Sequence, residues 1–152
     1  MARRKKNATA KQKENLNVLL KEEVVHQGCE SEIQAIAAVA NKKVRIVYTF
    51  GYGRYFCPNG HGWTSYRACI TFDMKNLCVS KMWRQYCRSC PEVGVTPEFK
   101  ATEQKAVVVD TIKRFFERIN NGPQEKRTNS KSEVKPHLRH LCEVCRSGLL
   151  CL

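Results

Sequence analysis

The residues best suited to chemistry in this chain are cysteines and histidines, which occur in clusters at the spacing of metal ligands. Two Cys-x-x-Cys pairs, 87–90 and 142–145, each place two thiolates on one side of a tight turn. Cys57 is followed by His61 across a turn that contains Gly60, which adds a thiolate and an imidazole. Zinc binds four such ligands tetrahedrally, and a site closed by four protein side chains is structural. The clusters therefore predict bound zinc in preference to a set of ordinary buried thiols.

The simplest ligand assignment puts one zinc ion between the first two clusters, with Cys57, His61, Cys87 and Cys90 as its ligands. A second ion would use the C-terminal cluster, whose candidate ligands are Cys142, Cys145, Cys151 and either His137 or His140. Spacing leaves another pairing open, in which the 142–145 pair completes the first site and the 87–90 pair belongs elsewhere. We expect one or two Zn2+ ions per chain.

The segment between the first two clusters is predicted to be a β-hairpin. Residues 63–72 and 77–86 are rich in strand-forming residues, and Asp-Met-Lys-Asn at 73–76 separates them as a turn. A hairpin flanked by two metal-binding turns is the layout of a zinc ribbon. Cys69 and Cys78 fall in the two strands without ligand spacing, so we expect them to be packing residues.

Helical patterns flank this hairpin on both sides. Apolar residues recur at helical spacing in three segments: 14–26, 31–40 and 102–120. Residues 44–57 alternate as a strand, in which Gly51 and Gly53 indicate a bulge or a close approach. The predicted fold class is α+β: a zinc-ribbon-like antiparallel sheet with metal-binding turns, N-terminal helices and one long helix after the second turn.

We expect five regions along the chain. They are a basic disordered tail (1–13), a helical N-terminal segment (14–42), a zinc-binding core with a C-terminal helix (43–120), a flexible linker (121–136) and a Cys/His cluster that folds back on the core (137–152).

Basic residues outnumber acidic ones, 27 to 14, which gives a net charge of +13. Such a charge attracts polyanions in a salt-sensitive way, and the tail could act as a nuclear-localisation or polyanion-binding arm. Basic and aromatic residues also interleave in the strands, a pattern that favours single-stranded RNA because rings stack on bases and cations contact phosphates. The candidate nucleic-acid-binding residues are Arg3, Arg4, Lys5, Lys6, Arg54, Tyr55, Arg67, Lys81 and Arg84.

The sequence argues against a membrane-spanning protein and against an enzyme. The longest apolar run, 35–40, is far shorter than the ~20 residues of a membrane helix, and no secretory signal opens the chain. We therefore expect a cytoplasmic protein, with the nucleus or the membrane periphery as alternatives. A zinc deaminase needs a His-x-Glu motif, which neither His26 nor His61 begins, and a catalytic zinc needs an open coordination position. We therefore predict a non-enzymatic protein.

The order of these motifs resembles the 3CxxC-type zinc-finger family, which includes receptor-transporting proteins and zygote arrest proteins. After the first turn come Trp63-Thr-Ser65, a strand pair, Gln85-Tyr-Cys87-Arg-Ser-Cys90, Pro97-Glu-Phe99, a helix, His137 and Cys142-Glu-Val-Cys145-Arg-Ser-Gly148-Leu-Leu-Cys151. The match covers about residues 48–152 and is nearer the receptor-transporting branch. The family's first pair is Cys-x-x-Cys, whereas here the second ligand would be His61, one place later.

The resemblance implies a choice between two functions. Similarity to receptor-transporting proteins implies an accessory or adaptor protein that binds client membrane receptors and aids their trafficking. Similarity to zygote arrest proteins implies an RNA-binding zinc-finger module in post-transcriptional control, which is the alternative.

Overall fold

An antiparallel sheet organises the chain. The computed structural model describes residues 2–121 and 138–147. Strands β1 (Ile46–Phe56), β2 (Gly62–Asp73) and β3 (Cys78–Met82) lie in the order β1-β2-β3, and β4 (Gln85–Tyr86) pairs with β5 (Gly94–Val95) in a second ladder. The linker expected from 121 onward lies, beyond its first residue, outside the described residues, as do the candidate ligands His137 and Cys151.

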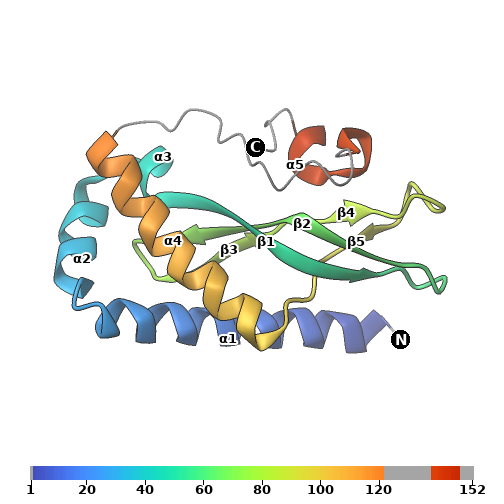
Figure 1. Cartoon of the computed structure of the whole chain (residues 1–152), viewed down its shortest axis with the longest axis horizontal. Helices are drawn as coiled ribbons and strands as arrows, with labels where there is room; N and C mark the ends of the chain where they lie inside the picture. Colours follow the sequence, from blue (N-terminus) through green and yellow to red (C-terminus); the bar gives the residue numbers. More distant parts are fainter. Residues whose placement is uncertain (1, 122–137, 148–152) are drawn as a thin grey trace.

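Helices precede and follow the sheet: α1 (Ala2–His26), α2 (Glu30–Val39), α3 (Lys42–Arg45) and α4 (Ala101–Asn121). Figure 1 shows α4 crossing the sheet diagonally, with α1 along the bottom of the molecule; α4 contacts β1 and α1, and α1 also contacts β3. The short helices η2 (Arg139–Leu141) and α5 (Glu143–Arg146) follow later in the chain. The predicted α+β class, with a long helix after the strands, is confirmed. In the described part of the chain, no helix combines the length and apolarity needed to cross a membrane.

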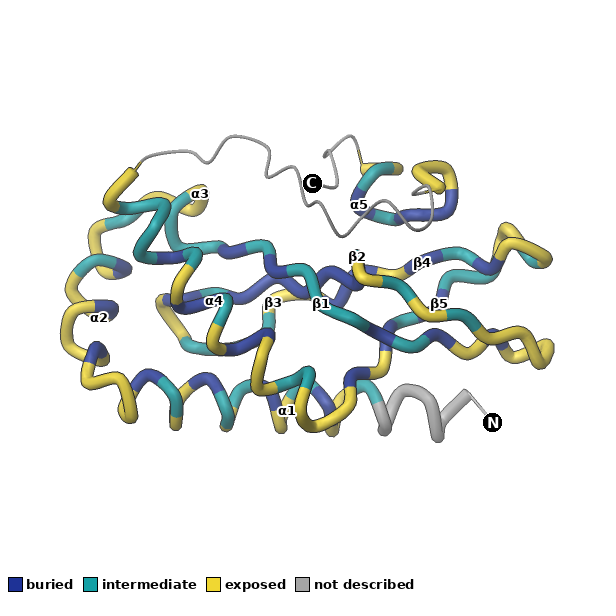
Figure 2. Tube along the Cα trace, viewed as in Figure 1, coloured by how far each residue is buried: buried dark blue, intermediate teal, exposed yellow. Residues whose placement is uncertain are grey.

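The main core lies between the helices and one face of the sheet, which we call the inner face. Along β1, alternate residues such as Val47, Thr49 and Tyr55 are buried on this face, as the period of a strand requires (Figure 2). Helix α4 buries Ile112 and Phe115 against them. Each such apolar side chain stabilises the fold by about 1.5–3 kcal/mol through burial. The even-numbered residues of β1, which are less buried, lie on the opposite face, the outer face: Tyr48, Phe50, Tyr52, Arg54 and Phe56.

Glycines in β1 allow this close packing. The register between β1 and β2 shifts between Gly51 and Gly53, which confirms the expected bulge. A Cβ on Gly53 would lie 2.7 Å from the Cβ of Ala68, closer than side chains can pack. Strand β2 therefore lies directly against the backbone of β1 at this point. Beyond it, β1 continues to Phe56, the residue before Cys57.

The prediction of a disordered tail over 1–13 is wrong from Ala2 onward, because α1 begins there. Its second half buries Leu16 and Leu20 in the core, and Gln12 is also buried. The Gln12 amide donates to the carbonyl of Pro97 at 3.0 Å and accepts from the Phe99 N–H at 2.6 Å. Lysine and arginine are good helix formers, so a basic composition does not prevent the helix from extending beyond its packed turns.

Candidate metal centre

Three thiols and one imidazole converge at the end of the sheet. The ligand atoms of Cys57, His61, Cys87 and Cys90 all lie within 4.8 Å of one another. We call these four residues the metal group. Two turns, 57–61 and 87–90, supply them, and both turns project from the ends of strand ladders. A set of four Cys and His side chains at this separation is what tetrahedral zinc requires.

The first turn is built by backbone hydrogen bonds. The N–H of Cys57, just after β1, donates to the carbonyl of His61 at 2.7 Å, and the N–H of Gly60 donates to the carbonyl of Cys57 at 3.0 Å. Gly60 has φ +88°, a left-handed conformation that favours glycine. The turn therefore brings His61 back beside Cys57, which is why the sequence needs glycine before the histidine.

The second turn is held in the same way. The N–H of Val93 donates to the carbonyl of Cys90 at 2.8 Å, and the N–H of Cys87 donates to the carbonyl of Val93 at 3.1 Å. The ladder of β4 and β5 then continues the pairing at Gln85 and Val95. This short hairpin orients both thiols of the second pair toward the first turn.

The thiols of the metal group lie close enough to affect one another's ionisation. Burial raises the pKa of the Cys87 thiol. Hydrogen bonds from the N–H groups of Cys90 and Ser89 and from the Cys57 thiol lower it by more, so the pKa of Cys87 lies below its ordinary value. A hydrogen bond from Asn59, at 3.2 Å, lowers the pKa of Cys90, but burial and the neighbouring thiols raise it above its ordinary value. A dication bound between the thiols would favour the ionised form of all of them.

The imidazole of His61 completes this group. Its Nδ1 lies 3.5 Å from Sγ of Cys87 and 3.7 Å from Sγ of Cys90. His61 is exposed, whereas Cys57 and Cys87 are buried. Zinc bound here would join the two turns through four protein ligands. It would have no coordination position left for a substrate.

Aromatic packing supports the metal group from inside the sheet. The rings of Tyr55 and Trp63 stack at 5.2 Å between centroids. The indole N–H of Trp63 donates to Oε1 of Gln85 at 3.0 Å, and the Gln85 amide donates to Oγ of Ser65 at 3.0 Å. These contacts tie β2 to β4, so the two metal-binding turns are held at a fixed separation.

The fold and this ligand set define a small zinc-binding ribbon module. The chain matches the family model of a 3CxxC zinc ribbon, described as a zinc-binding domain, over residues 50–148. It therefore belongs to this family, and Zn2+ is its expected metal. No curated protein and no solved structure shows significant similarity to the chain. The match spans both turns of the metal group and the 142–145 pair.

The C-terminal pair lies apart from the metal group. Cys142 is buried beside Cys69, Trp83 and Val144, and Cys145 is half-buried at the edge of this cluster. Within residues 2–121 and 138–147, the metal group is the one place where three or more candidate ligand atoms converge. His137 and Cys151, the further ligands expected for a second ion, lie outside that range, and His140 is exposed.

The candidate nucleic-acid-binding residues occupy different environments. Tyr55 is fully buried against Trp63, so it is not available to stack on a base, which corrects that prediction. Lys81 and Arg84 contact the carboxylate of Glu143. The side chains of Arg3, Arg4, Lys5 and Lys6, in the first turns of α1, lie outside the described part of the structure.

Exposed rings on the outer face were missing from the predicted set. Tyr66 is 74% exposed, and its ring centroid lies 4.6 Å from that of Tyr52. Phe56 is 47% exposed, with the guanidinium of Arg54 5.9 Å from its ring centroid; Arg67 is half-buried near the bulge. The alternation of β1 could have separated these residues from Tyr55, because even-numbered positions face outward along this strand.

Proposed function

We propose that this chain is a non-enzymatic zinc-stabilised adaptor that binds a client membrane protein and aids its trafficking. The observation that carries the proposal is the metal group. Its four protein ligands satisfy tetrahedral zinc, so the ion serves to join the two turns, and function is left to the surface. The family resemblance to receptor-transporting proteins supports a membrane-protein client.

The outward face of α4 is the surface we assign to the client. It presents Ala106 and Val109 beside Lys105 and Lys113, and Asp110 on the same surface pairs with Arg114; the opposite face of the helix packs on the sheet. Val109 is 38% exposed. A narrow apolar stripe bordered by lysines fits a partner helix with acidic residues at its rim.

The proposal is tested by measuring the surface level of membrane receptors in cells that express the chain. The Val109→Asp variant is expected to lose any increase in receptor level, because it places a charge in the apolar stripe. Val25→Asp, at another exposed valine on α1, is the matched control and should retain the increase. Equal activity of the two variants, or no effect of the wild-type chain on any receptor, would count against the adaptor function.

Binding of single-stranded RNA is the second candidate, favoured by the exposed rings of the outer face. The exposed rings of Tyr66 and Phe56 lie on the outer face with the half-buried Tyr52, and Arg54 adds a cation beside Phe56. Aromatic rings stack on bases with about 1–3 kcal/mol per base, and cations contact the backbone. The surface therefore has both elements that sequence-tolerant binding of single strands needs.

This candidate is tested by titrating the zinc-loaded protein with a uridine oligonucleotide over a series of salt concentrations. The double variant Tyr66→Ala with Phe56→Ala is expected to bind at least about fivefold more weakly at every salt concentration. Val18→Ala, an exposed position on α1, should bind like the wild type. If the double variant also binds like the wild type, the affinity comes from net charge alone and the outer face is not an RNA surface.

A further inference from the structure

Residues 138–147, which we call the C-terminal segment, lie against the outer face of the sheet. The side chains of Leu141, Cys142 and Val144 are buried. Cys142 and Val144 pack with Cys69 and Trp83, and with Tyr48 and Phe50 at the margin. The segment therefore covers the half of the outer face that the exposed rings do not occupy, and it hides an aromatic surface.

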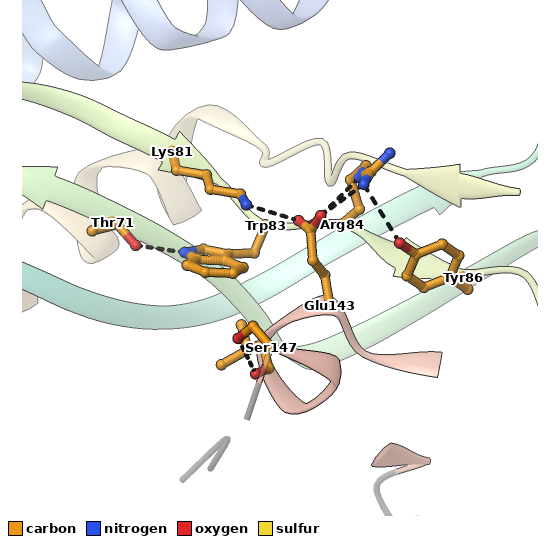
Figure 3. A network of polar contacts seen from close by, with 8 residues as sticks. Thr71, Lys81, Trp83, Arg84, Tyr86, Glu143 and Ser147 are labelled. Carbon is orange, nitrogen blue, oxygen red and sulfur yellow. Dashed lines mark hydrogen bonds and ion pairs between the residues drawn. The ribbon is translucent and has the colours of Figure 1, made fainter. Parts of the chain in front are cut away.

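A carboxylate fixes the segment in place, as Figure 3 shows. Oε2 of Glu143 accepts hydrogen bonds from Nη2 of Arg84 at 2.7 Å and from Nε at 3.1 Å, and Oε1 accepts from the Arg84 N–H at 3.0 Å. The N–H of Glu143 donates in return to the carbonyl of Arg84 at 3.1 Å. The ammonium of Lys81 adds an ion pair at 3.7 Å. Paired hydrogen bonds between arginine and a carboxylate are directional and strong, so this pair acts as a clamp.

The other end of the segment contacts the second metal-binding turn. The guanidinium of Arg146 lies 3.6 Å from the ring centroid of Tyr86, which immediately precedes Cys87. It also donates to the carbonyl of Pro91, which immediately follows Cys90, at 3.4 Å. A bridge between Gln85 and Cys142 joins the same two parts of the chain. The surface on which the segment docks is therefore made in part by the turn that supplies two ligands of the metal group.

Zinc would add to the few backbone hydrogen bonds that hold this turn. Strands β4 and β5 contain two residues each, which is too little ladder to hold a turn without further support. Binding of a structural zinc ion supplies that support, because the energy of metal binding is folding energy. Without zinc we expect Tyr86 and Pro91 to be held less firmly, and with them both of these contacts of Arg146.

We propose that zinc binding at the metal group and docking of the C-terminal segment are linked, with the Arg84–Glu143 clamp and Arg146 as the connection. Loss of zinc releases the segment and uncovers Trp83 and the adjoining rings. Because linkage is reciprocal, loss of docking must also weaken zinc binding by the same factor. The metal state thus controls whether the C-terminal segment covers this aromatic surface.

The reciprocal effect gives the sharper test. Zinc affinity is measured by competition with a zinc-binding dye, in full-length protein that carries Cys145→Ser and Cys151→Ser so that the metal group alone is titrated. Glu143→Gln is expected to weaken zinc binding about 10-fold, within the usual range of coupling between sites. Arg146→Gln should also weaken zinc binding, because it removes the contacts of the segment with Tyr86 and Pro91. Glu117→Gln, which alters a surface ion pair with Lys113 on α4, is the control and should leave the affinity unchanged.

Hydrogen exchange read by mass spectrometry tests the direct effect. As a chelator withdraws zinc, amides of residues 141–147 are expected to lose protection while β1 residues 47–50 keep theirs. Unchanged zinc affinity in both Glu143→Gln and Arg146→Gln overturns the proposal. So does protection of the segment that persists without zinc, or that disappears only together with protection of β1.

Discussion

Gly51 in β1 and Val107 in α4 approach so closely that a Cβ on Gly51 would lie 2.6 Å from Cγ2 of Val107. Carbon atoms that are not bonded to each other prefer separations of about 3.5–4.0 Å. The same added atom would also lie 3.2 Å from Cε1 of Phe99, in the segment that leads into α4. The helix therefore packs on bare backbone at this point, and the contact sets the distance between α4 and the sheet.

Replacing Gly51 with alanine should accordingly destabilise the fold. We expect Gly51→Ala to lower the free energy of unfolding by about 1–3 kcal/mol, because the helix or the strand must shift to admit the methyl group. Gly62→Ala is the matched control, since its nearest neighbour would be the carbonyl oxygen of Tyr55 at 3.6 Å, an ordinary contact. Urea unfolding of both zinc-loaded variants makes the comparison. A Gly51→Ala protein as stable as the control would mean that α4 does not rest on this part of β1.

The metal group predicts very different consequences for two cysteine substitutions. Cys90→Ser should reduce the bound zinc by one ion per chain and lower the melting temperature, because a structural zinc contributes on the order of 10 kcal/mol in small fingers. Cys69→Ser places a hydroxyl in the buried cluster around Trp83, at a cost of about 1–3 kcal/mol, and should keep its zinc at the metal group. The two variants are compared by their zinc content, measured by elemental analysis, and by their melting temperatures. Equal losses in the two variants would contradict the ligand assignment.

Local spacing accounts for what could be predicted from the sequence. The Cys-x-x-x-His and Cys-x-x-Cys turns carry their own geometry, since a few backbone hydrogen bonds close each of them. The turn between β2 and β3 is similarly local: Asp73 accepts from the N–H of Lys75 at 2.9 Å and from the side chain of Asn76. The apolar period of Val108, Ile112 and Phe115 likewise marks the buried face of α4.

Contacts between distant parts of the chain could not be predicted in this way. Gln12 binds backbone groups of Pro97 and Phe99, and nothing near Gln12 in the sequence indicates that it is buried. Glu143 and Arg84 are equally remote from each other in the chain. The sequence suits Tyr55 to a binding face as well as to a core, because aromatic residues occur in both, and only the phase of β1 relative to the helices decides between them.

The clamp also predicts a pH dependence of stability. Burial raises the pKa of the Glu143 carboxyl, but hydrogen bonds from Arg84 outweigh burial, and the pKa lies below its ordinary value. A carboxyl of this kind stabilises the fold fully above its unfolded-state pKa, near about 4.3, and its contribution is lost as the pH falls through the lower folded-state value. The wild type should therefore exceed Glu143→Gln in unfolding free energy by about 1 kcal/mol at pH 7, since Arg84 is half-exposed and solvent screens the pair.

Unfolding by urea at several pH values tests this expectation. Both proteins are unfolded at the same saturating zinc concentration, and the difference in unfolding free energy reports Glu143 together with its proposed contribution to zinc binding. We expect that difference to be constant above about pH 5 and to shrink as the pH falls below about 4.3. A difference that grows toward acid pH would show that the carboxyl is not paired with Arg84 in solution.

The buried thiol of Cys69 should be chemically inert in the folded protein. Burial, together with the nearby Cys142, raises the pKa of Cys69 well above its ordinary value, and the opposing effect of Arg114 is smaller. Cys78 also has a raised pKa, from burial and from Asp73, but it is only half-buried. Because the thiolate is the nucleophile, and because Cys69 is buried whereas Cys78 is only half-buried, iodoacetamide at pH 8 should label Cys78 faster than Cys69. Peptide mass spectrometry of the native protein measures both rates, and in guanidinium chloride the two should become equal. Rapid labelling of Cys69 in the native, zinc-loaded state would show that the outer face is open there and that the C-terminal segment does not cover it.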